Sequence, residues 1–267
     1  MPRTDVPKAW RIFLQEQGTH VRPASCREEI EAAYRLVYRS YVLRGYIPPN
    51  ESAIRLSIFN AFPESITFVG LVNGAVVATV SLVADTPAGL PMDGIYHEEV
   101  QALRDAGRRL TEVTMLADRR SELKRTLPML LSLMKQLFDY ATLVLKADDL
   151  CITINPRHDE FYRRYLLFTD LGGLRPYPSV SDNPALARRL DLDTVREACE
   201  GNELLLGHFY ENRTPASVFV ERYRMTPEDL RYFFTELTPS LREAGEDVVA
   251  SLKAARPDCP WDAWRAR

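Results

Sequence analysis

The sequence predicts a mixed α/β protein, in which helices cover both faces of one twisted, mostly antiparallel sheet and a helical segment follows. Three observations support this fold class. Two apolar runs flank Asn73-Gly74, the residue pair most typical of a two-residue hairpin turn. Strand and helix patterns then alternate over residues 109–180, as in crossover connections between strands. From residue 191 onward the pattern is helical.

The N-terminal half is expected to supply an arm, a helix, two paired strands and an irregular excursion, in that order: residues 1–27, 28–44, 65–72, 75–85 and 86–108. The arm should hold a short helix, and the longer helix after it ends at Gly45. Both hairpin strands are apolar at nearly every position, which indicates a sheet covered on both faces. A short helix is expected within the excursion, at residues 96–106.

The next part of the chain should contain a strand, a basic link, a helix, a strand, a helix and a short last strand: residues 109–118, 119–125, 126–146, 148–155, 158–168 and 174–180. Gly172 and Gly173 are expected to break the last of these helices, and residues 184–190 to form a polar turn or helix. Residues 28–190 therefore make one sheet domain, and residues 191–267 a C-terminal helical extension.

Composition argues against several classes of protein. The 267 residues are 46% apolar, which indicates a globular chain, and a formal net charge of −3 gives no support for nucleic-acid binding. The four cysteines lie far apart, and neither they nor the four histidines have the spacing of a metal site. We find no apolar run as long as a signal peptide or a membrane span. We therefore expect a cytoplasmic protein with reduced thiols and no metal.

Residues 109–118, RLTEVTMLAD, place one carboxylate in a strand that otherwise has the pattern of buried core. Strand alternation puts one set of side chains on the face of Glu112 and the remaining set on the other: Leu110, Thr114 and Leu116, against Thr111, Val113 and Met115. A carboxylate is costly to bury unless it is paired or has a chemical role. Two interpretations remain open from the residue alone: Glu112 lies at a strand end near water or an arginine, or it is functional.

The element order, with a Glu-bearing central strand and a tyrosine near the start of a later helix, resembles the GNAT acyltransferase superfamily. Four strings narrow this resemblance: AAYRLVYRSYVLRGYI, GLPMDGIYHEEVQALRDAGRRLTEVTMLAD, INPRHDEFYRRYLLF and YPSVSDNPAL. Together they resemble the long-chain N-acyl amino acid synthases, which are relatives of the acyl-homoserine-lactone synthases. The resemblance spans residues 28–190 and implies a GNAT-like sheet. It also implies acyl transfer from a thioester to an amine.

The implied chemistry assigns roles to residues of this chain. A base must first deprotonate the ammonium of the acceptor, and the resemblance gives this role to Glu112, whose apolar neighbours should raise its pKa. The oxyanion would be bound by backbone N–H groups near Thr114, Met115 and Leu116. Tyr162 matches the tyrosine that protonates the leaving thiolate, with a packing role in its helix as the alternative.

The link after the central strand, DRRSELKRTLP, departs from the acyl-CoA users of the superfamily, whose glycine-rich loop cradles the pyrophosphate at this place. It has no glycine and carries four basic residues: Arg119, Arg120, Lys124 and Arg125. The resemblance implies that the donor is often an acyl group on acyl carrier protein, and a basic patch suits docking of an acidic carrier. A solvated, charged link is the alternative. We expect no cofactor, because the thioester on the carrier's phosphopantetheine is a substrate.

An acyl chain needs an apolar channel, and an amino-acid acceptor needs a partner for its carboxylate. Channel candidates lie on the central strand and on the helix after it: Met115, Leu116, Met129, Leu130, Leu133 and Met134. Methionine suits an adaptable lining, although each of these residues also fits an ordinary core. Acceptor candidates are Arg39, Arg44, Arg157 and His158, with a surface or structural role as the alternative for each.

The sequence therefore predicts an N-acyltransferase that makes a long-chain N-acyl amino acid from an acyl-carrier-protein thioester. One alternative is another GNAT enzyme, either an acyl-CoA-dependent acyltransferase or a signal-lactone synthase. The other is a GNAT-like module that binds an acyl chain or a partner without catalysis. No motif specifies the acceptor amino acid, the chain length or the oligomeric state.

Overall fold

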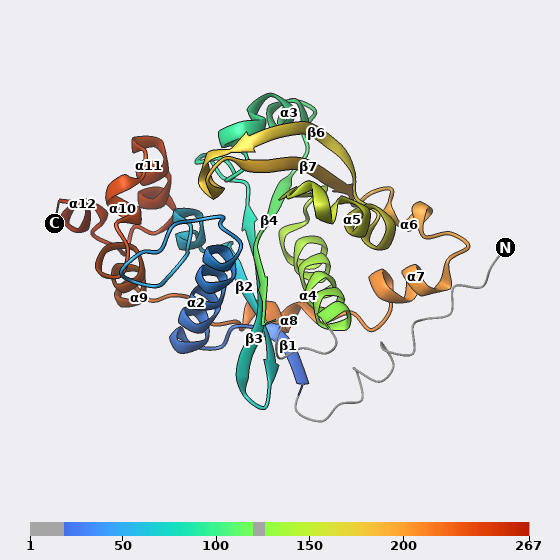
Figure 1. The fold of residues 1–267 in the computed structure, drawn as a ribbon, viewed down its shortest axis with the longest axis horizontal. Coiled ribbons are helices and arrows are strands. Elements are labelled where there is room, and N and C mark those ends of the chain that lie inside the picture. The colour runs from blue at the N-terminus through green and yellow to red at the C-terminus, as the bar shows by residue number, and fades with distance from the viewer. Residues whose placement is uncertain (1–18, 120–125, 267) are drawn as a thin grey trace.

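The computed structural model describes residues 19–119 and 126–266 (Figure 1). Its centre is a seven-stranded sheet in the order β1-β2-β3-β4-β5-β7-β6. The strands are β1 (Thr19–Pro23), β2 (Ile66–Val72), β3 (Ala75–Ala84), β4 (Leu110–Asp118), β5 (Asp149–Ile154), β6 (Thr169–Tyr177) and β7 (Asn183–Asp191). Among the described strands, β4 and β5 pair in parallel and all other neighbours are antiparallel. The predicted fold class is confirmed.

Helices cover both faces of this sheet. Those of the sheet domain are α2 (Arg27–Leu43), α3 (Asp93–Asp105), α4 (Thr126–Tyr140) and α5 (Asp159–Leu166). The helices that follow are α6 (Val195–Ala198), α7 (Glu203–Tyr210), α8 (Ala216–Val220), α9 (Pro227–Arg231), α10 (Ser240–Glu243), α11 (Glu246–Ala255) and α12 (Trp261–Arg265). Single helical turns are η1 (Ile58–Ala61), η2 (Ala141–Leu145), η3 (Pro156–His158), η4 (Pro178–Val180) and η5 (Tyr232–Glu236).

The β2–β3 hairpin forms as its sequence predicts. Asn73 and Gly74 have φ values of 50° and 78°, the left-handed conformations that a type I′ turn requires and that Asn and Gly tolerate best. Almost every side chain of the two strands is buried, because helices pack on both sides. Figure 1 shows α2 on one side of these strands and α4 on the other.

The C-terminal extension contributes to the cores on both faces of the sheet. Phe209 of α7 and Phe219 of α8 join the core that α4 forms with the sheet. Phe233 of η5, Leu252 of α11 and Trp261 of α12 join the core under α2. In Figure 1, α6 and α7 lie on the side of α4, and α9–α12 lie beyond α2. The extension is therefore part of the folded body, and it helps to cover both faces of the sheet.

Residues 184–190, predicted as a polar turn or helix, form the strand β7, so that prediction is wrong. The misleading signal is the pair of arginines, whose charges are neutralised in place. Arg188 donates to Asp159, with Nε 2.6 Å from Oδ1, and Arg189 lies 2.9 Å from the buried carboxylate of Asp149. Ala185 and Ala187 supply the buried face between them. A strand can accommodate such arginines when carboxylates of neighbouring elements pair with them.

Two other elements differ from the sequence-based expectation. Residues 19–23, placed in the N-terminal arm, form the edge strand β1, which pairs with β2. Gly172, expected to break a helix, lies within β6, where a Cβ atom would come 2.5 Å from the ring of Tyr96. Tyr96 needs that space, because its hydroxyl donates to the carbonyls of Gly173 and Ala185. The glycine therefore permits a close approach of α3 to the sheet.

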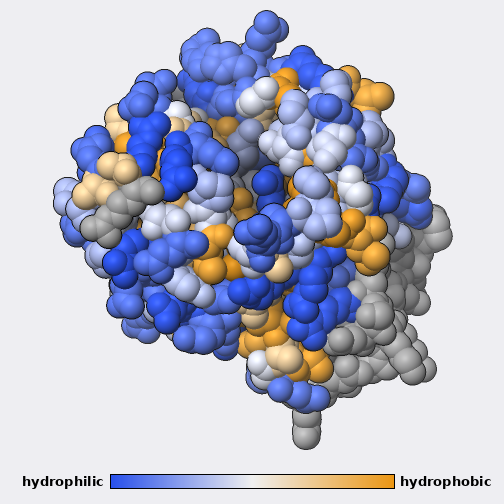
Figure 2. Space-filling view, turned by 60° about the vertical axis from the view of Figure 1, so that its left-hand side comes forward, coloured by the Kyte–Doolittle hydropathy of each residue, from blue (hydrophilic) through white to orange (hydrophobic). Residues whose placement is uncertain are grey.

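The surface of the protein is mixed in character. On the face shown in Figure 2, hydrophobic residues form several small groups separated by hydrophilic ones. The large apolar side chains that are exposed are spread over α2, α5, β6 and α8: Leu43, Tyr165, Leu174, and the pair Val218 and Val220. Within residues 19–119 and 126–266, no helix has the combined length and apolarity that crossing a bilayer requires.

Candidate active site

The site begins where β4 and β5 separate. Their parallel register runs only from Leu110 to Val113 on β4, opposite residues 149–152. Beyond this point β4 contains a bulge, because Thr114 pairs with Ser81 but Ala117 pairs with Thr79. Met115, inside the bulge, has a φ of 54°, which is unusual for a residue other than glycine. The second half of β4 therefore has β3 on one side and an open gap on the other.

The bulge also reverses the faces of β4. Val113 and Leu116 both belong to the core under α4, whereas Met115 and Ala117 belong to the core under α2. The prediction that Leu116 shares a face with Glu112 is therefore wrong, and so is the assignment of Met115 to the opposite face. One extra residue in a strand shifts the alternation, and nothing in the side chains of RLTEVTMLAD announces it.

Glu112 is 2% exposed and lies in the wall of a cavity that fills the gap between the strands. Its carboxylate accepts a hydrogen bond from the backbone N–H of Met92, over 2.8 Å. Burial raises the pKa of Glu112 to about 8, the Met92 N–H lowers it in part, and the nearby charge of Asp93 raises it. A carboxylate with this pKa can accept a proton at neutral pH, as a general base must.

The N-terminus of α3, which holds the Met92 N–H, is fixed by a small network of charges. Arg104 donates two hydrogen bonds to each of two carboxylates, Asp85 on the chain after β3 and Asp93 in the first turn of α3. Asp93 in turn accepts from the Leu90 N–H. Arg104 therefore connects the end of the hairpin to the segment that contacts Glu112.

The cavity has a volume of about 560 Å³, within the range of sites that hold small molecules. Its apolar wall includes residues of β4, α4, β5 and α5: Met115, Leu116, Met129, Leu130, Leu133, Ile152 and Phe161. Five of the six predicted channel residues are among them. Met134, the sixth, is buried in the core behind the wall and does not line the cavity.

Tyr162 reaches the cavity from α5 and is otherwise enclosed. It is 4% exposed, and its ring packs edge-on against Phe161 and Phe168. Burial, together with the nearby Tyr41, raises the pKa of its hydroxyl above the ordinary value. The structure thus brings Tyr162 and Glu112 into one cavity from two different elements.

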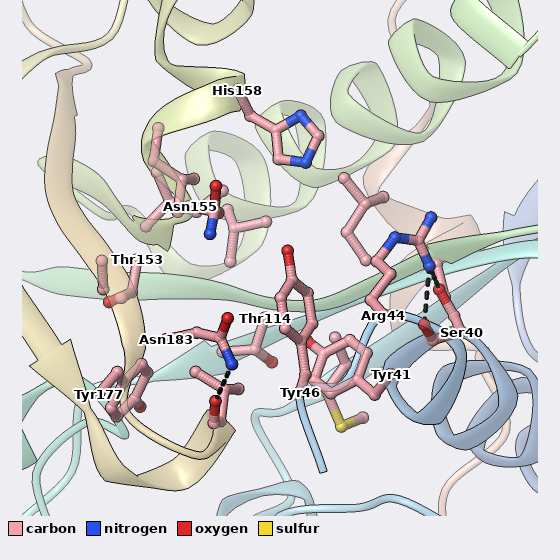
Figure 3. Close-up of a pocket in the computed structure, with 18 of the residues that line it drawn as sticks. Ser40, Tyr41, Arg44, Tyr46, Thr114, Thr153, Asn155, His158, Tyr177 and Asn183 are labelled. Carbon is pink, nitrogen blue, oxygen red and sulfur yellow. Dashed lines mark hydrogen bonds between the residues drawn. The ribbon is translucent and has the colours of Figure 1, made fainter.

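Further polar side chains line the cavity, including Thr114, which the sequence singled out for its backbone N–H and not for its hydroxyl. Figure 3 shows Thr114 of β4 and Thr153 of β5 among them, and within the described structure neither buried hydroxyl has a hydrogen-bond partner. Tyr41 and Tyr46 approach from the end of α2, and Tyr177 from the end of β6. The two threonines offer hydrogen bonds to a ligand, because a buried hydroxyl without a partner carries a free-energy cost.

Three of the four predicted acceptor residues line the cavity. Arg44 donates to the backbone carbonyl of Ser40, over 2.9 Å, and to its hydroxyl. Arg157 donates to the Tyr46 hydroxyl over 2.6 Å and to the ring of His158 over 3.1 Å. Figure 3 shows His158 above the cavity and Arg44 at its side. Arg39 is exposed on α2 and does not line the cavity.

The predicted carrier-docking residues mostly lie outside the described residues. Arg120, Lys124 and Arg125 fall in the gap at 120–125. Arg119 follows β4, and its backbone N–H donates to the carbonyl of Val77 over 2.8 Å. In the described parts of the chain, no group of three or more His, Cys, Asp or Glu side chains is placed to hold a metal ion, and the four cysteines are free thiols.

Comparison with known proteins now identifies the family. The model of the N-acyl amino acid synthase FeeM family matches residues 32–191. The chain belongs to this family. It is 34% identical to the structure of FeeM, an N-acyl amino acid synthase from uncultured soil microbes, with a TM-score of 0.59; the match covers 66% of this chain and 90% of FeeM. The resemblance predicted from the sequence is confirmed, and the enzyme is an N-acyltransferase with a GNAT-like fold.

More distant structures share the fold. The acyl-homoserine-lactone synthase LasI is 14% identical with a TM-score of 0.51, over 74% of this chain and 96% of LasI. The CoA-dependent acyl-homoserine lactone synthase BjaI is 14% identical with a TM-score of 0.50, over 68% of this chain and 89% of BjaI. No curated protein sequence matches the chain. All three structures leave part of the chain unmatched.

Proposed function

We propose that this N-acyltransferase moves a long-chain acyl group from the thioester of an acyl carrier protein to the amino group of an amino acid. The observation that carries the proposal is the position of Glu112: a buried carboxylate with a raised pKa, in the wall of a largely apolar cavity that opens where β4 and β5 part. Such a cavity accommodates an acyl chain beside a base.

The proposed reaction begins when Glu112 takes a proton from the acceptor's ammonium group. The neutral amine attacks the thioester carbon, and backbone N–H groups of β4 at the bulge around Met115 stabilise the oxyanion. The C–S bond then breaks as the amide forms. The acceptor's nitrogen loses two protons in all. Glu112 takes the first, and the second leaves the attacking nitrogen for Tyr162 as the Tyr162 hydroxyl protonates the departing thiolate, so that Tyr162 ends in its starting state.

The proposed donor rests on the link after β4. This link has no glycine, so the backbone cradle that holds the pyrophosphate of CoA has no counterpart in its sequence. Its four basic residues, Arg119, Arg120, Lys124 and Arg125, suit an acidic carrier protein, which would present its phosphopantetheine to the cavity. The long apolar wall of α4 supports a long acyl chain, with Met129, Leu130 and Leu133 in contact with it.

The test compares donors and acceptors with the purified enzyme. Palmitoyl-acyl carrier protein and palmitoyl-CoA are each incubated with the twenty amino acids, and products are identified by mass spectrometry. We expect N-palmitoyl amino acid from the carrier-bound donor at a rate at least ten times that from CoA. Faster reaction with CoA would refute the assignment of the donor. Intact thioester with every acceptor would refute the assignment of an amino-acid acceptor.

A further inference from the structure

Arg55 lines the cavity together with Glu112. Its side chain is half-buried. Within the described residues, its guanidinium makes one hydrogen bond, from Nη2 to the backbone carbonyl of Ser179 over 3.3 Å, and no ion pair. A guanidinium has five N–H donors, so four remain for a ligand.

The backbone around Arg55 directs this side chain to the cavity. Its two neighbours, Ile54 and Leu56, are 2% and 5% exposed and belong to the core under α2. Because both neighbours point into that core, Arg55 points away from it, toward the cavity. The Arg55 N–H also donates to the carbonyl of Tyr34, over 3.3 Å, which attaches the segment to α2. The fold therefore fixes the backbone from which the Arg55 side chain extends to the cavity.

The other arginines of the cavity wall are already engaged. Arg157 is exposed, and two of its five donors bind Tyr46 and His158. Arg44 donates to the carbonyl and the hydroxyl of Ser40. Arg55 is thus the cavity arginine with the most donors left over.

Arg55 and Glu112 act on the same two neighbours. Burial raises the pKa of Tyr41, which the charge of Arg55 lowers and that of Glu112 raises. Burial also raises the pKa of Tyr177, and the same two charges act on it with the same signs. Both side chains line one cavity together with Tyr41 and Tyr177, and both act on these two tyrosines.

We infer that Arg55 binds the α-carboxylate of the amino-acid acceptor, with the acceptor's amino group directed to Glu112. This inference rests on the proposed function and specifies how its acceptor is recognised. An α-amino acid carries its two charged groups on one carbon atom, so a cation and a base in one cavity fit both. A planar guanidinium is well suited to a carboxylate, which can accept two parallel hydrogen bonds from it. Acceptors that lack the carboxylate should bind poorly.

The experiment compares amino acids with their primary amides, which keep the amino group and side chain but lose the negative charge. Glycine, L-leucine, L-tyrosine and L-glutamine are each tested beside the matching amide, with the donor at saturation. The variants are Arg55→Gln, Arg55→Lys and a control, Arg164→Gln, because Arg164 lies on α5, is 68% exposed and does not line the cavity. Binding of the same compounds is measured by calorimetry in the absence of donor.

The native enzyme should favour the acid over the amide by about ten- to a hundredfold in kcat/KM, the usual effect of a charge-assisted hydrogen bond. Arg55→Gln should raise KM for the acid until acid and amide are equal, and leave the rate with the amide and KM for the donor unchanged. Arg55→Lys should keep part of the preference, and Arg164→Gln all of it.

Two kinetic results and one binding result would overturn the inference. The kinetic results are an acid-over-amide preference that survives in Arg55→Gln, and equal losses with acid and amide, which indicate a structural role. Calorimetry distinguishes a failure of the Arg55 inference from a failure of the proposed function. If the native protein binds amino acids through Arg55 but forms no N-acyl product, the carboxylate site is supported and the proposed reaction is refuted. If the native protein binds acid and amide equally, the carboxylate site itself is refuted.

Discussion

Two carboxylates, Glu112 and Asp139, are almost fully buried on opposite sides of the sheet, yet their surroundings differ. Asp139, in α4, is 0% exposed and accepts hydrogen bonds from Lys135, from Arg213 Nε over 2.7 Å and from the Thr214 N–H over 2.9 Å. Glu112 accepts one, from the Met92 N–H. The three donors offset the cost of burying the charge of Asp139, which therefore has a structural role as the anchor of the C-terminal extension. A single hydrogen bond offsets only part of the cost of burying the charge of Glu112, so its pKa is raised and its carboxylate can take part in proton transfer.

The largest expected effect comes from removing the charge of Glu112. Glu112→Gln keeps the shape and can still accept the Met92 hydrogen bond, but it cannot take a proton. We expect acyl transfer to fall about a hundred- to ten-thousandfold, the usual contribution of a general base. The measurement is the single-turnover rate with saturating acceptor, beside a thermal melt that should show no loss of stability. Near-native turnover would show that Glu112 is not the base.

The same change at the other carboxylate should affect stability and spare the chemistry. Asp139→Asn leaves two partly buried cations, Lys135 and Arg213, without their counter-charge. We expect the free energy of unfolding to fall by about 3 kcal/mol, as when one partner of a buried ion pair is removed. Urea unfolding measures this. The control is Asp262→Asn, because Asp262 is 80% exposed and its ion pair with Lys253 lies at the surface, where such pairs contribute little. If folded Asp139→Asn enzyme lost its acyl-transfer activity, Asp139 would not have the purely structural role that distinguishes it from Glu112.

Glu112 should also make stability depend on pH. Its pKa is about 8 in the folded state, against 4.5 as the ordinary value. Between these values the folded state binds more protons than the unfolded state, so Glu112 makes the free energy of unfolding fall as pH rises from 4.5 to 8. Glu112→Gln lacks this dependence. The free energy of unfolding of the variant, relative to that of the native enzyme, should therefore increase by a few kcal/mol between pH 4.5 and pH 8. Above pH 8 the difference should stay constant. A difference that is already constant below pH 8 would show that Glu112 ionises normally.

The rate of the native enzyme should rise with pH through the same region, because the base must be unprotonated. Arg104 is a positioning residue for this behaviour, since it neutralises Asp93, whose charge raises the pKa of Glu112. Arg104→Met should lower kcat about tenfold, or about 1.4 kcal/mol, and move the midpoint of the pH–rate profile upward. Arg104→Lys should restore part of both. A lower rate with an unmoved midpoint would indicate a purely structural role.

Local signals predicted the parts of this protein that local physics determines. The Asn73-Gly74 turn, the apolar strands around it and the isolated Glu112 could all be recognised in the sequence. The strand β7 could not, because its arginines read as solvent-exposed until the fold supplies Asp149 and Asp159. Partners that are distant in sequence decided the outcome there.

The candidate site shows the same division. Glu112 and Tyr162 were predicted from the resemblance to the family, and the channel residues from their positions on expected elements. The structure brings both catalytic candidates and most of the channel residues into one cavity. Arg55 and Tyr177 were missed, since both lie on irregular or edge segments with no periodic pattern. The bulge at Met115 was missed as well, because a backbone with positive φ leaves no mark on the side chains of a non-glycine residue.

The contribution of the C-terminal extension to both cores has a consequence for the order of events during synthesis. Phe219 completes the core under α4, and Phe233, Leu252 and Trp261 complete the core under α2. The sheet is formed by residues up to 191, which leave the ribosome before these four apolar side chains do. A nascent chain of that length exposes apolar surface on both sides of its sheet. We therefore expect the sheet to be stably folded only after the C-terminal extension has been synthesised and covers this surface.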